Sequence, residues 1–139
     1  MIESLAISAA LALPICHNSL ANAIHDAGFR GANVREAWSI AMRESGGNPS
    51  SISTTGDYGV FQFNKASHKG AAWWDSKRLL TRSYNIGVAF RISKGGKSWR
   101  AWDLSGTGKF LGHYTSKSTG LKYQFWYKQF PQTCIALTR

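Results

Sequence analysis

The stretch "NVREAWSIAMRESGG", residues 33–47, decides most of what the sequence predicts about the fold. Its apolar side chains recur at the three- and four-residue spacing of an amphipathic helix, and a pair of glycines interrupts that spacing. Asn33 can cap the free N–H groups at the start, with Glu36 three residues on as its reciprocal partner. We therefore expect a helix that begins at Asn33 and runs to about Ser45.

Two acids on this helix occupy different positions. Laid out at about 100° per residue, the helix gathers its apolar side chains on one arc: Val34, Ala37, Trp38, Ile40, Ala41 and Met42. Glu44 lies inside that arc, whereas Glu36 takes the solvated position expected of most charged helical residues. Burial and the negative end of the helix dipole both raise the pKa of Glu44. The alternative is that Glu44 extends out of the last turn or pairs with a Lys or Arg.

Size and charge limit the classes of protein to consider. At 139 residues with 43% hydrophobic residues, the chain suits a single domain over residues 1–139. Seventeen Lys and Arg against seven Asp and Glu give a formal charge of +10, which favours polyanionic partners. The basic residues are scattered among aromatics, unlike the dense run of a nucleic-acid arm. We expect a monomer without a specific nucleic-acid partner.

The N-terminal stretch "LAISAALALPI", residues 5–15, is strongly apolar but too short to span a membrane. With "ANA" at residues 21–23 it mimics a secretory signal, yet Glu3 stands where a basic region is expected. We favour a first core helix stopped by Pro14 over a cleaved signal peptide. Stable membrane insertion is not expected.

Two cysteines, Cys16 and Cys134, lie near opposite ends of the chain. They can form a disulfide in an oxidising compartment or remain as two buried free thiols. Neither has a second cysteine at metal-ligand spacing, and the four histidines share no helix face. We expect no metal and no cofactor.

The remaining segments complete a predominantly α-helical α+β prediction. Helical spacing marks residues 18–29 and 82–96, each stopped by glycine, and a short helix is expected in "SWRAWD" at 98–103. Turn residues over 48–59 lead into a short strand or hairpin. "LKYQFWYKQF", residues 121–130, alternates like a strand but has the length of a helix, so its structure stays open.

Four short motifs occur in one order: "RESGGNP", "GDYGVFQFN", "AAWWD" and "SWRAWD". In this combination, over roughly residues 20–103, the chain resembles the lysozyme-like superfamily of peptidoglycan-cleaving enzymes. "AWSIAMRESGGNPSSI" looks like soluble lytic transglycosylases and many phage wall-degrading domains, in which a helix ends in the catalytic Glu and a Ser follows. The resemblance implies a lysozyme-like fold with a small β-hairpin region beside the catalytic helix, with Glu44 and Ser45 in those two places.

The second motif carries the other candidate carboxylate. "DYGVFQFN" is similar to the strand of c-type lysozymes whose Asp is the second catalytic carboxylate, a place that Asp57 occupies here. An alternative for Asp57 is a turn residue that bonds its own backbone. "WWD" resembles the tandem tryptophans of sugar subsites, which implies glycan contact for Trp73 and Trp74. "SWRAWD" resembles a stretch that places Trp99 against the catalytic acid.

Further substrate contacts follow from the same resemblance. Gln62 and Asn64 look like polar positions of the glycan floor. Tyr58 is either a ring packed under the hairpin or a hydroxyl on the cleft wall. Tyr84 and Asn85 begin the later helix at places that resemble substrate-side residues of the transglycosylases, with ordinary packing and capping as the alternative.

The resemblance implies a glycosidase of the muramidase type that cuts the β-1,4 bond between N-acetylmuramic acid and N-acetylglucosamine. Glu44 is then the general acid and Asp57 the nucleophile or charge stabiliser. The alternatives are a lytic transglycosylase that uses Glu44 alone, and a non-enzymatic cationic protein that binds wall polymer or nucleic acid. The expected place of action is extracellular or directed at the cell wall, for which phage lysins and virion-associated enzymes are examples.

Overall fold

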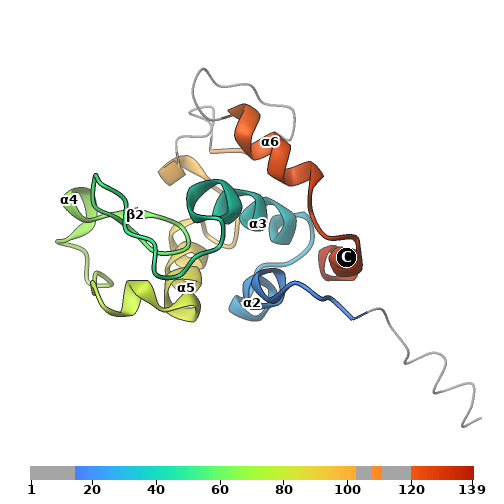
Figure 1. Ribbon diagram of the computed structural model, residues 1–139, viewed down its shortest axis with the longest axis horizontal. Helices are drawn as coiled ribbons and strands as arrows, with labels where there is room; N and C mark the ends of the chain where they lie inside the picture. Colours follow the sequence, from blue (N-terminus) through green and yellow to red (C-terminus); the bar gives the residue numbers. More distant parts are fainter. Residues whose placement is uncertain (1–14, 103–107, 111–119) are drawn as a thin grey trace, which may run out of the picture.

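The computed structural model in Figure 1 describes residues 15–102, 108–110 and 120–139. The predicted first core helix ending at Pro14 falls outside the described residues. The α-helices are α2 Ser19–Ala27, α3 Ala32–Ser45, α4 Lys65–His68, α5 Arg82–Ile92 and α6 Gly120–Lys128. The described residues also form the 3-10 helices η1 Arg78–Leu80, η2 Arg100–Trp102 and η3 Gln132–Thr138, and the strands β1 Asp57–Tyr58 and β2 Phe63–Asn64. The predominantly α-helical α+β prediction is confirmed.

Helix α3 lies in the middle of the molecule, between α6 on one side and α2 with α5 on the other (Figure 1). The apolar arc predicted from the spacing is its buried face: Val34, Ala37, Ile40 and Ala41 are fully buried and Trp38 nearly so. The helix ends where the spacing breaks, because Gly46 adopts the left-handed conformation with φ 65° and its N–H donates to the carbonyl of Met42. This last turn carries Glu44.

The start of α3 differs from the prediction. The helix begins at Ala32, and its N-cap, Gly31, makes no side-chain hydrogen bond. Asn33 donates instead to the carbonyl of Gly95 at 2.9 Å, and Glu36 accepts from the indole N–H of Trp99 at 2.9 Å. The expected reciprocal capping between Asn33 and Glu36 is therefore wrong, because a distant segment supplies partners for both side chains.

The undecided segment 121–130 is mainly the helix α6, which packs on α3. The ring of Trp38 meets the ring of Phe130 edge-on at a centroid separation of 5.5 Å. Arg35 stacks over the ring of Tyr127 at 4.3 Å and donates to the Tyr127 carbonyl at 2.8 Å. Contacts with α3 therefore decide the structure of a segment whose own sequence pattern is ambiguous.

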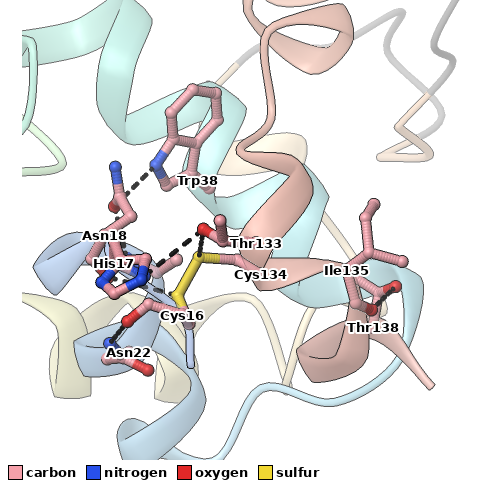
Figure 2. The surroundings of a disulfide bond; sticks show 10 residues. Cys16, His17, Asn18, Asn22, Trp38, Thr133, Cys134, Ile135 and Thr138 are labelled. Carbon is pink, nitrogen blue, oxygen red and sulfur yellow. Dashed lines mark hydrogen bonds between the residues drawn. A yellow bond between two sulfur atoms is a disulfide. The ribbon is translucent and has the colours of Figure 1, made fainter. Parts of the chain in front are cut away.

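The two cysteines form a disulfide, which settles the alternative left open by the sequence (Figure 2). Cys16 precedes α2 and Cys134 lies in η3, and 118 positions of sequence separate them. The backbone N–H of His17 also donates to the Thr133 hydroxyl at 3.3 Å. The bond therefore fastens the C-terminal segment to the start of the described chain.

In the portion of the chain that the structure describes, no helix has the length and apolar character needed to cross a membrane.

Reduction of the disulfide should lower the free energy of unfolding by about 2–5 kcal/mol, because the bond removes loop entropy from the unfolded chain. Urea denaturation with and without a thiol reductant measures the difference. The double variant Cys16→Ser/Cys134→Ser is the control, and reductant should have no further effect on it. Equal urea midpoints for oxidised and reduced wild-type protein would contradict the prediction.

Candidate active site

Glu44 stands in the last turn of α3 with only 14% of its side chain exposed. One carboxyl oxygen, Oε1, accepts from the hydroxyl of Tyr123 on α6 at 2.8 Å. The other, Oε2, accepts from Nη1 of Arg43 at 3.0 Å. The carboxyl group is thus held from its own helix and from α6.

Burial raises the pKa of Glu44 above its ordinary value of 4.5. The positive charge of Arg43 and hydrogen bonds from Tyr123 and Arg43 act in the opposite direction, and the negative charge of Asp57 adds a further rise. Burial dominates, so Glu44 keeps its proton to a higher pH than an exposed glutamate does.

Asp57 begins the hairpin, and its pKa is shifted downward. Its Oδ2 accepts from the hydroxyls of Ser53 and Thr55, and its Oδ1 accepts from the amide of Asn64 at 2.9 Å. Partial burial raises the pKa of Asp57, but these three hydrogen bonds together outweigh it and bring the pKa below 3.8. Asp57 is therefore the ionised partner of a protonatable Glu44.

The two carboxyl groups line one cleft of about 310 Å³. Its walls come from the end of α3, the hairpin, α4, η2 and α6. The described residues that line it are Arg43, Glu44, Asp57, Gln62, Phe63, Asn64, Ser67, His68, Ala101, Trp102 and Tyr123. An acid and an ionised carboxylate thus face one cavity lined by both polar and aromatic side chains.

A family model described as a lysozyme-like domain matches residues 21–104. This range covers more than half of the chain and contains both carboxyl groups. The chain belongs to the lysozyme-like domain family. No curated protein and no solved structure matches it. Membership supports peptidoglycan-cleaving activity in general, by a glycosidase or a lytic transglycosylase.

The hairpin of this lysozyme-like domain orients Asp57 through the opposite strand. Asp57 pairs with Asn64 across the antiparallel sheet. The side-chain amide of Asn64 donates to Asp57. Its Oδ1 accepts from the N–H of Ser67, so Asn64 also caps the start of α4. Gln62 has φ 55°, and its amide donates to the carbonyls of Ser51 and Gly59 at 3.2 and 2.9 Å. Gln62 and Asn64 therefore line the cleft and also brace the hairpin.

Asn85 attaches this hairpin to the core. Its side chain is fully buried, accepts from the N–H of Phe61 at 2.8 Å, and donates to the carbonyls of Leu79 and Tyr58 at 2.9 and 3.0 Å. Gly59 approaches so closely that a Cβ there would lie 2.3 Å from the Asn85 amide nitrogen. The packing alternative for Asn85 is the one that the structure shows.

Ser45 fastens the end of α3 to the hairpin and does not line the cleft. Its hydroxyl donates to the carbonyl of Val60 at 2.7 Å and accepts from the N–H of Gly47 at 3.1 Å. The hydrogen bond from Ser45 to Val60 therefore fixes the distance between the end of α3, which carries Glu44, and the hairpin.

Four aromatic residues considered as substrate contacts do not line the cleft: Tyr58, Trp73, Trp74 and Tyr84. Trp73 packs against two residues that do line it, with ring centroids 5.4 Å from Phe63 and 5.2 Å from His68. Tyr58 packs edge-on against Trp74, and the hydroxyl of Tyr84 donates to the carbonyl of Trp73. Trp73 and Tyr84 also border a separate hollow of about 270 Å³.

The expected placement of Trp99 against the catalytic acid is wrong. Trp99 is fully buried, stacks on Phe29 at 5.9 Å and donates to Glu36. Glu36 precedes Glu44 by eight residues, or about 12 Å along the helix axis. The expected solvated position of Glu36 is also wrong, since burial raises its pKa from 4.5 to about 7, although the hydrogen bond from Trp99 lowers it.

Sequence reasoning missed several residues that line the cleft. Tyr123 lies beyond the matched range and 79 positions after Glu44, in a segment whose secondary structure the sequence left open. Arg43 could have been predicted from the sequence, because it directly precedes Glu44. Trp102 belongs to the motif "SWRAWD", from which Trp99 was selected instead, and His68 lies in none of the four motifs. Within the described ranges, no group of three or more His, Cys, Asp or Glu is placed to hold a metal ion.

Replacement of Asn85 by Ala should lower the free energy of unfolding by about 2–4 kcal/mol, because two buried backbone groups and one partly buried carbonyl lose their partner. Urea denaturation checks this value. Asn48→Ala is the matched control, since Asn48 is exposed and its side chain accepts a hydrogen bond from the N–H of Ser50. A loss no larger than that of the control would show that the hairpin does not depend on Asn85.

Proposed function

We propose that this chain is a peptidoglycan-cleaving glycoside hydrolase of the muramidase type. It cuts the β-1,4 bond between N-acetylmuramic acid and N-acetylglucosamine. The observation that supports the proposal is the pair of carboxyl groups, Glu44 and Asp57, whose pKa values are moved in opposite directions within one cleft. Glycoside cleavage generally needs an acid and an ionised carboxylate in this relation.

In the proposed reaction, Glu44 donates its proton to the glycosidic oxygen as the bond from that oxygen to the sugar carbon breaks. Asp57 faces the positive charge that develops on the sugar ring, as nucleophile or charge stabiliser. Water then supplies the hydroxyl group of the new reducing end, and its proton restores the acid. Before substrate binds, Tyr123 and Arg43 both orient the carboxyl of Glu44 through their hydrogen bonds.

Glu44→Gln should abolish lysis while the protein still folds, because the amide cannot donate an acidic proton. The expected fall is roughly 100- to 10,000-fold, the usual contribution of a general acid. Clearing of a bacterial wall suspension measures it, with circular dichroism to confirm folding.

The matched control for this experiment is Glu36→Gln, which changes the other half-buried acid of α3. It should retain lysis, because Glu36 does not line the cleft. Full activity of the Glu44 variant would refute the assignment. Clearing by neither wild type nor variant would leave a cationic binding protein as the better description.

A lytic transglycosylase is the second candidate, and the hydrogen bonds of Asp57 favour it. Ser53, Thr55 and Asn64 already occupy this carboxylate, as in a residue that stabilises its own turn. On this route a hydroxyl of the muramyl sugar attacks after Glu44 has donated its proton, and Glu44 then acts as the base.

Mass spectrometry of the cleaved glycan separates the two routes. We expect reducing ends, which a hydrolase produces, and a fall in rate of roughly 100-fold or more for Asp57→Asn, because the amide cannot stabilise positive charge. Anhydro-muramyl ends together with near-normal activity of Asp57→Asn would establish the transglycosylase route instead.

A further inference from the structure

Arg43 is the permanently charged cation among the described residues that line the cleft. Its side chain is 24% exposed, and its guanidinium carbon lies 5.7 Å from the ring centroid of Tyr123. In the part of the chain that the structure describes, the guanidinium makes one hydrogen bond, from Nη1 to Glu44. A guanidinium has five N–H donors, so most of its capacity is left for a ligand in the cleft.

The chemistry of this group favours a carboxylate. The planar fork of an arginine matches the two oxygens of a carboxylate and can bind them with two parallel hydrogen bonds. Glu44 uses only one N–H of the fork, at 3.0 Å from one oxygen. A protonated Glu44, which the proposed reaction requires, is a weaker partner still because it carries no charge. An incoming carboxylate therefore competes well for Arg43.

The proposed substrate carries such a group. Each muramyl residue bears a lactyl side chain, which ends in a carboxylate or continues into a stem peptide that contains carboxylates. N-acetylglucosamine has none, so recognition of this charge would distinguish muramyl-containing chains from neutral amino-sugar polymers.

We propose that Arg43 is a specificity-determining residue that exchanges its ion pair with Glu44 for an ion pair with a carboxylate of the muramyl residue. The inference rests on the proposed function and names the feature of the substrate that the cleft selects.

The exchange of ion pairs couples substrate binding to the protonation state of Glu44. Among the described residues, the titratable or charged groups that face Glu44 or its cleft are Arg43 on α3, Asp57 from β1, His68 from α4 and Tyr123 from α6. In the free protein, the charge and hydrogen bond of Arg43 lower the pKa of Glu44. Movement of Arg43 to the substrate removes this effect, so the pKa of Glu44 rises in the complex. Carboxylate binding and protonation of Glu44 therefore favour each other.

The experiment compares native bacterial walls with walls whose carboxyl groups have been converted to methylamides. For wild-type protein, kcat/KM should be roughly tenfold lower on the amidated walls, mainly through KM. For Arg43→Met the ratio of the two kcat/KM values should approach one. Arg43→Lys should give an intermediate ratio, because an ammonium keeps the charge without the fork.

Long-range attraction between the basic protein and the walls is controlled by Lys77→Met. Lys77 is exposed and does not line the cleft, and its loss changes the net charge by the same amount. This variant should keep the wild-type ratio. A second readout is the basic limb of the pH profile, which should lie higher for kcat than for kcat/KM on native walls. That difference should disappear in Arg43→Met.

Chains stripped of stem peptides identify the source of the carboxylate. Discrimination that persists on stripped chains assigns the ligand to the lactyl group, and discrimination that vanishes assigns it to the stem peptide; both results support the role of Arg43. A wild-type ratio in folded Arg43→Met would overturn the inference while wall cleavage itself continues. Failure of the wild-type protein to cleave either substrate would instead overturn the proposed function.

Discussion

The burial of one carboxyl group at the C-terminal end of α3 constrains the rest of the structure. A carboxylate in that position is disfavoured by lost hydration and by the negative end of the helix dipole. The group is tolerated because Tyr123 and Arg43 each contact one of its oxygens. One of these partners belongs to α6, which lies beyond the matched domain range of residues 21–104. The environment of the acid therefore depends on a segment that must be held against α3.

Several interactions outside the cleft provide this hold. Arg35 binds the carbonyl and the ring of Tyr127, and Trp38 packs on Phe130, so α3 packs directly against the C-terminal segment. The disulfide then joins η3 to the chain before α2. The packing of α3 and the position of its acid therefore depend on each other. The contacts that hold α6 against α3 also bring Tyr123 within hydrogen-bond distance of Glu44.

Local patterns predicted α3, its glycine stop and the burial of Glu44, since periodicity reports which face of a helix is covered. The family resemblance predicted Asp57, Gln62 and Asn64 as site residues, and all three line the cleft. The failures share a different cause. Glu36 and Asn33 find partners in residues 95–99, and Tyr123 reaches Glu44 from 79 positions away. No local pattern records such contacts, because the side chains meet only after the chain has folded.

The two acids of α3 show that burial can raise the pKa of a carboxyl group without placing that group in a cleft. Burial raises the pKa of Glu36 to about 7, yet Glu36 accepts from the buried Trp99 and does not line the cleft. Its protonated form is favoured in the fold, so its contribution to stability is complete below pH 4.5 and is lost as the pH rises through about 7. Glu44 differs in its neighbours, since it shares its cleft with an ionised carboxylate. The useful criterion is therefore a pair of carboxyl groups that face one cavity and are driven to opposite protonation states.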